Sequence, residues 1–288
     1  MITIKLIGGQ GNQMFQYAYG RRISLIKGEK LKLDTSLLLC RIPRKNFTFR
    51  DYELGVFNIK AELTTLSKLA FYFNNSIFIL QILKNRLLKL FFDDIIFNEI
   101  QDNDNLDKKI IKSKRNIYIS GLFNKEQYLS EIEDALRQDF TFKDKLTGFN
   151  AEMAEKIQNT NSVSLHIRRG DLIKLGYAID KTDYYKKAVD YINRKVGNPT
   201  FFIFSDDIEW VKTNLKIIDN YFLIDKNKGK NSYIDMHLMS LCKHNIIANS
   251  TFSWWGAWLN KNKDKIVTTP KEYSDTQDYM MSKAWIRF

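Results

Sequence analysis

The second half of the chain alternates short apolar segments of strand type with amphipathic segments of helical type. The expected strands are 162–167, 200–204, 221–224, 245–248 and 265–268, and the expected helices are 183–196, 208–215, 231–243 and 252–260. Strands separated by helices form parallel sheets with helices on both faces. In such sheets ligands bind at the carboxyl ends of the strands. The pattern therefore predicts an α/β fold and directs the search for a site to the residues that follow each strand.

The first half of the chain begins with the same alternation and then loses it. The expected elements are strands at 2–7, 30–34 and 117–120 and helices at 13–27 and 125–138. An apolar and basic stretch at 63–98 and a polar loop at 99–109 interrupt the pattern. Small and polar residues cluster at 145–161, which favours a domain boundary there. We therefore expect two doubly wound domains, 1–150 and 151–288, since 288 residues suffice for two domains of medium size.

Composition and charge limit the function classes. Hydrophobic residues make up 44% of the chain, enough for a folded core, and 45 Lys and Arg against 33 Asp and Glu give a net charge of +12. Such a chain attracts anions, among them nucleotides, phosphorylated substrates, nucleic acid and anionic membranes. Cys40 and Cys242 are far apart and form neither a disulfide framework nor a zinc motif. The N-terminal segment has the alternation of a strand rather than of a signal peptide, so we expect a cytoplasmic protein.

A glycine-rich turn follows the first expected strand. Gly9, Gly11 and a later Asp34 have the positions of a dinucleotide fingerprint, which leaves an NAD(P)-dependent oxidoreductase as the alternative function. Met14 occupies the place of the third glycine of that fingerprint and argues against it. The amide side chains of the turn favour a loop that faces a sugar; they are Gln10, Asn12 and Gln13. A tight turn that only starts a helix is the structural alternative.

A charged motif follows the expected strand at 162–167. It reads His166-Ile167-Arg168-Arg169-Gly170-Asp171. Two adjacent guanidinium groups at a strand end offer planar pairs of donors to a diphosphate. Asp171 is expected to hold one of these groups while the other faces the ligand. An Arg–Asp pair with a purely structural role is the alternative.

Two further polar clusters follow later strands. Ser205 and Asp206 come after the strand at 200–204, where an acid can accept hydrogen bonds from a guanine edge or a ribose, or can simply cap the next helix. Ser250, Thr251 and Ser253 begin an expected helix, and a helix N-terminus with hydroxyl groups binds phosphate without a metal. The DxD spacing at 102–104 lies in a polar run that we interpret as a solvated loop, so no metal site is expected.

The four motifs together resemble the inverting α-1,2-fucosyltransferases of glycosyltransferase family 11, of the bacterial type that builds O-antigen and other surface glycans. They lie at residues 8–20, 166–171, 204–207 and 249–259, in the order found in that family. The resemblance implies a GT-B-like fold, with two Rossmann-like domains facing across a cleft. It also implies metal-independent transfer of L-fucose from GDP-fucose to the 2-hydroxyl of a terminal galactose. The domain 1–150 would then serve the acceptor and the domain 151–288 the donor.

The resemblance also implies roles for individual residues. The catalytic set comprises Arg168, which grips the donor phosphates, with Arg169 and Asp171. The donor-binding set comprises His166, Arg168, Ser205, Asp206, Ser250, Thr251 and Ser253. The acceptor-side set comprises Gln10, Asn12 and Gln13. No general base is assigned, because Asp171 is the family-matched acid and is also expected to hold an arginine.

The apolar and basic residues at 69–92 lead to a hypothesis about the acceptor. A segment of this kind suits a peripheral contact with the inner face of the cytoplasmic membrane, where a lipid-linked glycan would be the acceptor. A helix pair that packs against the core is the alternative. Nucleic acid is not an expected partner, since the basic residues are dispersed and no recognition motif is present.

Overall fold

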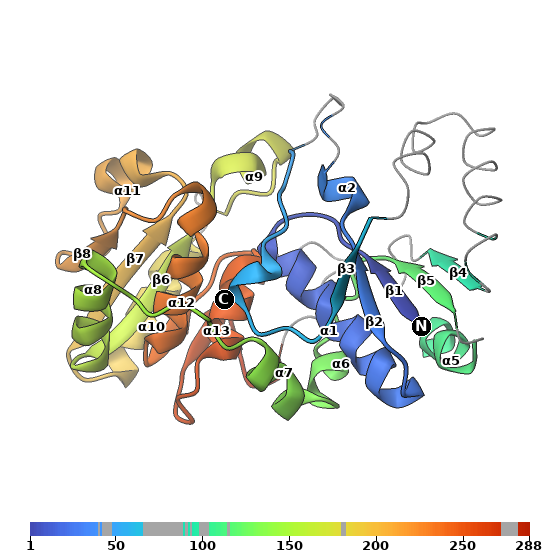
Figure 1. Cartoon of the computed structure of the whole chain (residues 1–288). Coiled ribbons are helices and arrows are strands. Elements are labelled where there is room, and N and C mark those ends of the chain that lie inside the picture. Colours follow the sequence, from blue (N-terminus) through green and yellow to red (C-terminus); the bar gives the residue numbers. More distant parts are fainter. Residues whose placement is uncertain are drawn as a thin grey trace. The chain divides into compact units, whose positions relative to one another are not determined.

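A computed structural model of the chain describes residues 1–39, 41, 48–65, 89, 92, 94–97, 104–113, 116–179, 183–271 and 282–288. These residues form two compact units, Met1–Lys143 and Asp144–Phe288. Each unit is built on its own parallel sheet, and most of the elements are labelled in Figure 1. The predicted α/β fold is thereby confirmed. The boundary between the units falls a few residues before the expected division at 150.

The first unit contains a five-stranded sheet in the order β3-β2-β1-β5-β4. Its strands are β1 (Ile2–Lys5), β2 (Leu31–Asp34), β3 (Glu62–Thr64), β4 (Asp94–Phe97) and β5 (Ile117–Ser120). Its helices are α1 (Gln10–Lys27), α2 (Ser36–Leu39), the 3-10 turn η1 (Leu54–Val56), α5 (Asp104–Lys112), α6 (Glu126–Ser130) and α7 (Glu133–Asp139). Every strand pairing of this sheet in the described residues is parallel.

Helix α1 packs against the central strands of this sheet. Its side chains that face the sheet are fully buried, Phe15 and Ile23 among them, as are Ile2 and Ile4 of β1. Gly20 lies where the helix crosses the sheet, because a Cβ there would be 2.5 Å from Ile4 Cγ1. The helix ends at Gly28, whose φ of 63° is left-handed and is easily adopted only by glycine. This packing fixes the turn between β1 and α1 at the carboxyl edge of the sheet.

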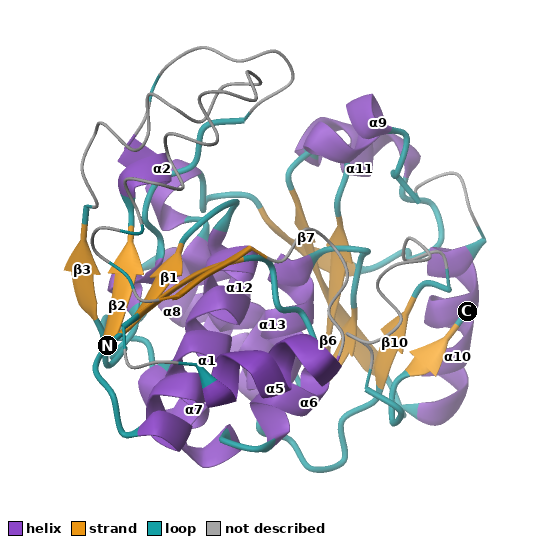
Figure 2. Ribbon diagram, turned by 90° about the vertical axis from the view of Figure 1, so that its right-hand side faces the viewer, coloured by secondary structure: helices purple, strands orange, loops and turns teal. Residues whose placement is uncertain are grey.

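The second unit contains a six-stranded sheet in the order β11-β10-β9-β6-β7-β8. Its strands are β6 (Asn161–Ile167), β7 (Pro199–Ser205), β8 (Tyr221–Ile224), β9 (His244–Ile246), β10 (Val267–Thr269) and β11 (Ile286–Arg287). Its helices are α8 (Phe149–Gln158), α9 (Gly170–Leu175), α10 (Tyr184–Lys195), α11 (Ile208–Asn214), the 3-10 turn η2 (Gly229–Asn231), α12 (Tyr233–Leu241) and α13 (Thr251–Leu259). Figure 2 shows α9 and α11 beyond the ends of the long central strands.

Both faces of this second sheet are buried, which explains the nearly continuous apolar runs of its strands. Along β7, Phe201 and Ile203 pack into a cluster with α10, whereas Phe202 and Phe204 point to the opposite face. There they meet Met153 of α8 and residues of α12. The alternation of the strand thus divides its side chains between two cores, as in a doubly wound sheet.

Two expectations about local structure are wrong, and one segment holds an element that was not expected. The polar segment at 145–161, where a domain boundary was expected, contains helix α8, whose buried residues Met153 and Ile157 pack into the core of the second unit. The polar loop at 99–109 includes the start of α5 at Asp104. The helix expected at 125–138 is two helices, because Ile132 leaves helical geometry with φ −134° and ψ 30°.

The hypothesis about a membrane-binding segment concerns residues outside this description. Of the stretch 69–92, the structure describes Lys89 and Phe92 alone. Phe92 is buried against Tyr118 of β5, with ring centroids 5.2 Å apart. Among the described residues, no helix has the length and apolar character needed to cross a bilayer.

Candidate functional site

Strands β6 and β7 end side by side and place two charged motifs together. The parallel register pairs His166 with Phe204 and Ile167 with Ser205. The next residues along the two strands are therefore Arg168 and Asp206. This is the carboxyl edge of the sheet, where α/β proteins bind their ligands. The sequence prediction that the two motifs share one edge is confirmed.

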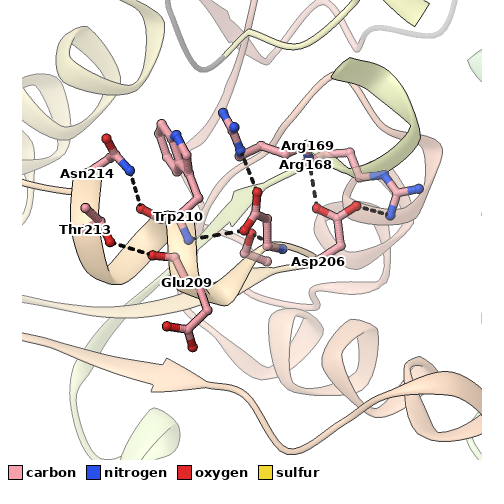
Figure 3. A network of polar contacts seen from close by, with 9 residues as sticks. Arg168, Arg169, Asp206, Glu209, Trp210, Thr213 and Asn214 are labelled. Carbon is pink, nitrogen blue, oxygen red and sulfur yellow. Dashed lines mark hydrogen bonds and ion pairs between the residues drawn. The ribbon is translucent and has the colours of Figure 1, made fainter. Parts of the chain in front are cut away.

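Arg168 forms an ion pair with Asp206. The Arg168 Nη1 atom lies 2.7 Å from Asp206 Oδ2. Figure 3 shows the two side chains facing each other. The other carboxylate oxygen of Asp206 accepts a hydrogen bond of 2.9 Å from the backbone N–H of Arg169. A Cβ on Gly170 would lie 2.4 Å from Asp206 Oδ2, so a side chain there would displace the carboxylate. Both oxygens of Asp206 thus fix the start of α9.

Arg169 is held by a different set of partners. Its Nε donates to Asp207 Oδ2 at 3.0 Å, and its guanidinium carbon lies 4.2 Å from the centre of the Trp210 ring. Asp207 also accepts from the backbone N–H of Trp210 and caps α11, so the alternative that this motif caps a helix is confirmed for Asp207. The side chain of Arg169 is 13% exposed and that of Arg168 is 25% exposed. Arg168 is therefore the more accessible of the two cations.

His166 lies at the end of β6, two residues before Arg168. It is 5% exposed, and its Nδ1 has no hydrogen-bond partner in the described residues. Burial and the nearby charge of Arg168 lower the pKa of His166 to about 3, so the imidazole is neutral at physiological pH. Tyr185 of α10 donates its hydroxyl to the His166 carbonyl at 3.0 Å. The site therefore contains a fixed, neutral ring with an unpaired nitrogen.

The motif at 249–259 begins helix α13, after β9. Ser250 is the N-cap and accepts from the backbone N–H of Phe252 at 3.3 Å. Ser253 is 1% exposed, and its hydroxyl accepts from the Ala248 N–H at 3.2 Å. Thr251 is partly buried at the first helical position. In the same way, the Ser205 hydroxyl accepts from the Asp207 N–H at 3.0 Å. These serine hydroxyls hold the turns that carry the site.

Two features of the sequence analysis fall on side chains that the structure does not describe. One is Asp171, which was expected to hold an arginine and whose backbone is in α9. In the described residues the arginines pair with Asp206 and Asp207. The DxD spacing at 102–104 also lies outside the described side chains. Within the part of the chain that the structure describes, no three His, Cys, Asp or Glu residues are grouped for a metal ion.

The acceptor-side residues lie in the first unit, at the turn between β1 and α1. Gln13 is fully buried, and its Nε2 donates to the carbonyls of Gly8 at 2.9 Å and Asp51 at 2.8 Å. Its Oε1 accepts from the Glu53 N–H at 3.0 Å. Asn12 packs on Gly8, where a Cβ would lie 2.6 Å from its Nδ2. The amide of Gln13 thus ties the protein's own backbone together.

The same turn bears on the oxidoreductase alternative. Asp34, the acid of the dinucleotide interpretation, is 2% exposed. Its Oδ2 accepts from the Tyr118 hydroxyl at 2.7 Å, and its Oδ1 accepts from the Ser36 N–H at 2.9 Å. The carboxylate is therefore part of the core rather than a partner for a ribose. Nothing in the described residues supports a nicotinamide site.

Sequence reasoning missed several residues that the structure places at these two edges. Trp210 and Tyr185 lie on helices and support Arg169 and His166, and Asp207 was considered only as a cap. Glu53 lies in a loop that reaches the α1 N-terminus from 40 residues away. The matched doublets of two arginines and two aspartates were the one signal that could have revealed the pairing.

The chain matches known proteins along nearly its whole length. The family model described as "Glycosyl transferase family 11" matches residues 1–287. The chain is 34% identical to the O-antigen biosynthesis glycosyltransferase WbnK of Escherichia coli, over 98% of each chain. It is 36% identical to an Escherichia coli alpha-1,2-colitosyltransferase, over 93% of this chain and 90% of the relative.

The fold also has a counterpart among solved structures. A NodZ alpha-1,6-fucosyltransferase soaked with GDP-fucose has a TM-score of 0.52 at 13% identity, covering 88% of this chain and 91% of that one. The similarity is one of fold, and it confirms the predicted GT-B-like class. Together with the match along the whole chain, the sequence identities show that this protein is a glycosyltransferase that belongs to glycosyltransferase family 11.

Proposed function

We propose that the chain transfers L-fucose from GDP-fucose to the 2-hydroxyl of a terminal galactose, with inversion to an α-1,2 linkage. The observation that carries this proposal is the pair of cations that follows β6, held by two aspartates that follow β7. Arg168 pairs with Asp206 and Arg169 with Asp207, and the charge of Arg168 acts on the neutral ring of His166. A prearranged pair of guanidinium groups suits the diphosphate of a nucleotide sugar.

The chemistry of the transfer needs such an arrangement. When the bond between fucose C1 and the phosphate oxygen breaks, the electron pair and the negative charge go to GDP. Cations fixed in advance stabilise this charge without having to reorganise during the reaction. Arg168 would contact the diphosphate, with Arg169 in support and the N–H groups at the start of α13 as further donors. We propose that these groups suffice without a metal ion.

The remaining residues of the donor site follow from their positions. His166 has an unpaired Nδ1 that can accept a hydrogen bond from the nucleotide. The partly buried Thr251 begins α13, where its hydroxyl would bind a phosphate oxygen. Asp206 is already engaged by both arginines, so we expect it to act on the nucleotide mainly by orienting Arg168. The roles first expected for Ser205, Ser250 and Ser253 would be played mostly by their backbones.

A second donor is a real candidate, because one relative is named as a colitosyltransferase. The name of that enzyme gives the same α-1,2 linkage that we propose, and its sequence is 36% identical to this chain. GDP-colitose therefore belongs in every donor comparison. We place GDP-fucose first because the four sequence motifs resemble those of fucosyltransferases.

The first unit would serve the acceptor, and the setting would be the assembly of a surface glycan. WbnK, named for O-antigen biosynthesis, supports a bacterial glycan of that type as the acceptor. A lipid-linked acceptor and a membrane contact through residues 69–92 on the cytoplasmic side are part of the same proposal. Flotation of the protein with liposomes rich in anionic lipid tests the contact, and protein that stays at the bottom of the gradient would refute it.

Thermal unfolding with a panel of nucleotides tests the proposed donor class. The panel comprises GDP, GDP-fucose, GDP-colitose, GDP-mannose, UDP and NADPH, each in EDTA. A ligand at about 100 times its Kd stabilises the native state by about 2.7 kcal/mol, which raises the Tm by roughly 5–10 °C for a protein of this size. We expect this rise with GDP and GDP-fucose. A rise with NADPH and none with GDP would refute the proposal.

A further inference from the structure

A loop of the first unit is fixed against the N-terminus of α1. The Glu53 backbone N–H donates to Gln13 Oε1 at 3.0 Å, and the Glu53 carbonyl accepts from Gln10 Nε2 at 3.3 Å. Both glutamines belong to the first turn of an 18-residue helix that follows β1. The loop therefore has a defined position at the carboxyl edge of the first sheet, the edge at which α/β units bind ligands.

The Glu53 carboxyl lies next to the turn that starts this helix. A Cβ on Gly9 would be 3.8 Å from Glu53 Oε2 and 3.8 Å from Arg50 Cζ, so both side chains lie in contact range of this turn. Glu53 Oε2 is buried and has no hydrogen-bond partner among the residues that the structure describes. A buried acceptor without a partner costs free energy, and each such atom in a native structure calls for an explanation.

A second unpaired acceptor lies on the same turn. Gln10 is 4% exposed, and within the described part of the chain its Oε1 has no hydrogen-bond partner. Gln10 and Glu53 are joined through the Nε2 contact, so their two acceptor atoms belong to one cluster. Each of these two oxygens can accept a further hydrogen bond, and sugar hydroxyls are donors. The chemistry therefore fits the acceptor glycan better than it fits a phosphate.

We propose that the Glu53 carboxylate is the general base that takes the proton from the acceptor hydroxyl, with Gln10 Oε1 accepting from a neighbouring hydroxyl. The inference rests on the proposed function. In the step, the hydroxyl oxygen forms its bond to fucose C1 while the bond from C1 to the GDP oxygen breaks. The electron pair of that bond leaves with GDP. The hydroxyl proton moves to Glu53, which returns it to water after the product leaves.

The electrostatic surroundings of Glu53 suit this role. Burial raises the pKa of the Glu53 carboxyl, and the charge of Asp51 raises it further. Arg50 and the backbone N–H of Gln10 act in the opposite direction, and the first turn of α1 carries no acidic residue. The net effect is a raised pKa, which makes the carboxylate a stronger base than an exposed glutamate.

The structural alternative is that Glu53 only caps the helix. The N-cap residue Gly9 has no side chain to do so, and the Glu53 carboxyl lies beside the first N–H groups of α1. Glu53→Gln separates the two roles, because the amide keeps an oxygen for the cap and loses the basicity. Glu133→Gln is the matched control, as it makes the same change on the exposed helix α7 of the same unit.

The test measures transfer by both variants and the wild type between pH 4.5 and 8.5, with the donor that the wild type uses. We expect Glu53→Gln to lose at least about 100-fold in kcat, while GDP raises its Tm as in the wild type. We also expect the wild-type kcat to rise with pH and then level off, and this rise to vanish in Glu53→Gln. Activity within threefold of the wild type, with the same pH profile, would overturn the inference.

A second variant and the pH profile of the wild type test the inference even if Glu53→Gln does not fold. If Glu53→Gln does not fold, Glu53→Asp keeps a carboxylate about 1.5 Å further back, and partial activity with the pH rise intact is expected. A wild-type kcat that does not change over this pH range would overturn the inference without any variant. An active wild type with an unaffected Glu53→Gln refutes the base and leaves the proposed function standing, whereas an inactive wild type with every donor refutes the proposed function itself.

Discussion

Replacing Asp206 with asparagine tests whether the aspartates orient the arginines. The carboxylate holds Arg168 Nη1 at 2.7 Å and accepts from the Arg169 N–H at 2.9 Å. Asparagine keeps one oxygen for the backbone N–H and places an NH2 group against a guanidinium, which has no acceptor. A charge-assisted hydrogen bond contributes about 1.5–3 kcal/mol, but both side chains are about a quarter exposed, with 25% and 24% accessible. Solvent screening reduces the contribution to about 1–2 kcal/mol.

This free energy sets the expected kinetic effect. If it is lost entirely from the positioning of Arg168, kcat/KM for the donor falls by about 5- to 30-fold. Steady-state kinetics and calorimetric titration with GDP measure the effect on Asp206→Asn. The control is Glu209→Gln on the neighbouring helix α11, where the side chain is 84% exposed and pairs with Lys212. An Asp206→Asn enzyme within twofold of the wild type in both measurements would refute the reasoning.

Three other substitutions give separate predictions. Arg168→Lys keeps the charge and loses the planar pair of donors, so kcat should fall by at least about 100-fold in a transfer assay with an unchanged circular dichroism spectrum. Burial raises the pKa of Asp235 to about 7, so its stabilisation is complete below its unfolded pKa and is lost as the pH rises through 7. Asp235→Asn keeps the oxygen that accepts from Asn227, and it should raise the Tm at pH 8 much more than at pH 5 in calorimetry. Gly20→Ala should lower the Tm, because the new Cβ would lie 2.5 Å from Ile4 Cγ1, and overpacking of about 1–3 kcal/mol outweighs the gain in helix propensity.

The strands and the edge that carries the site were predictable because their signals are local. An apolar run such as β7 is buried on both faces, so it appears in the sequence as a continuous stretch that ends at its first polar residue. Helix α8 was not predictable in the same way. It buries few apolar residues, Met153 and Ile157 among them, and its remaining polar character resembles that of a linker.

The pairing within the site depends on tertiary structure. Asp171 is adjacent to the arginines in the sequence and was therefore the expected partner. The structure also brings Asp206 and Asp207 to them, because β6 and β7 are neighbours in a parallel register. A register between strands cannot be read from either strand alone. The position of Glu53 was not predictable for a similar reason. Its loop is held by hydrogen bonds with Gln10 and Gln13 of α1, about 40 residues earlier in the sequence.

Transfer of the sugar itself is the most direct test of the proposed function. The protein is incubated in EDTA with GDP-fucose and a β-galactoside, and the product is isolated and its linkage assigned by NMR. We expect α-linked fucose on the galactose O2, with a matching release of GDP, and we expect Arg168→Lys to abolish both. Release of GDP without a fucosylated product, or turnover that requires an added metal ion, would contradict the proposal.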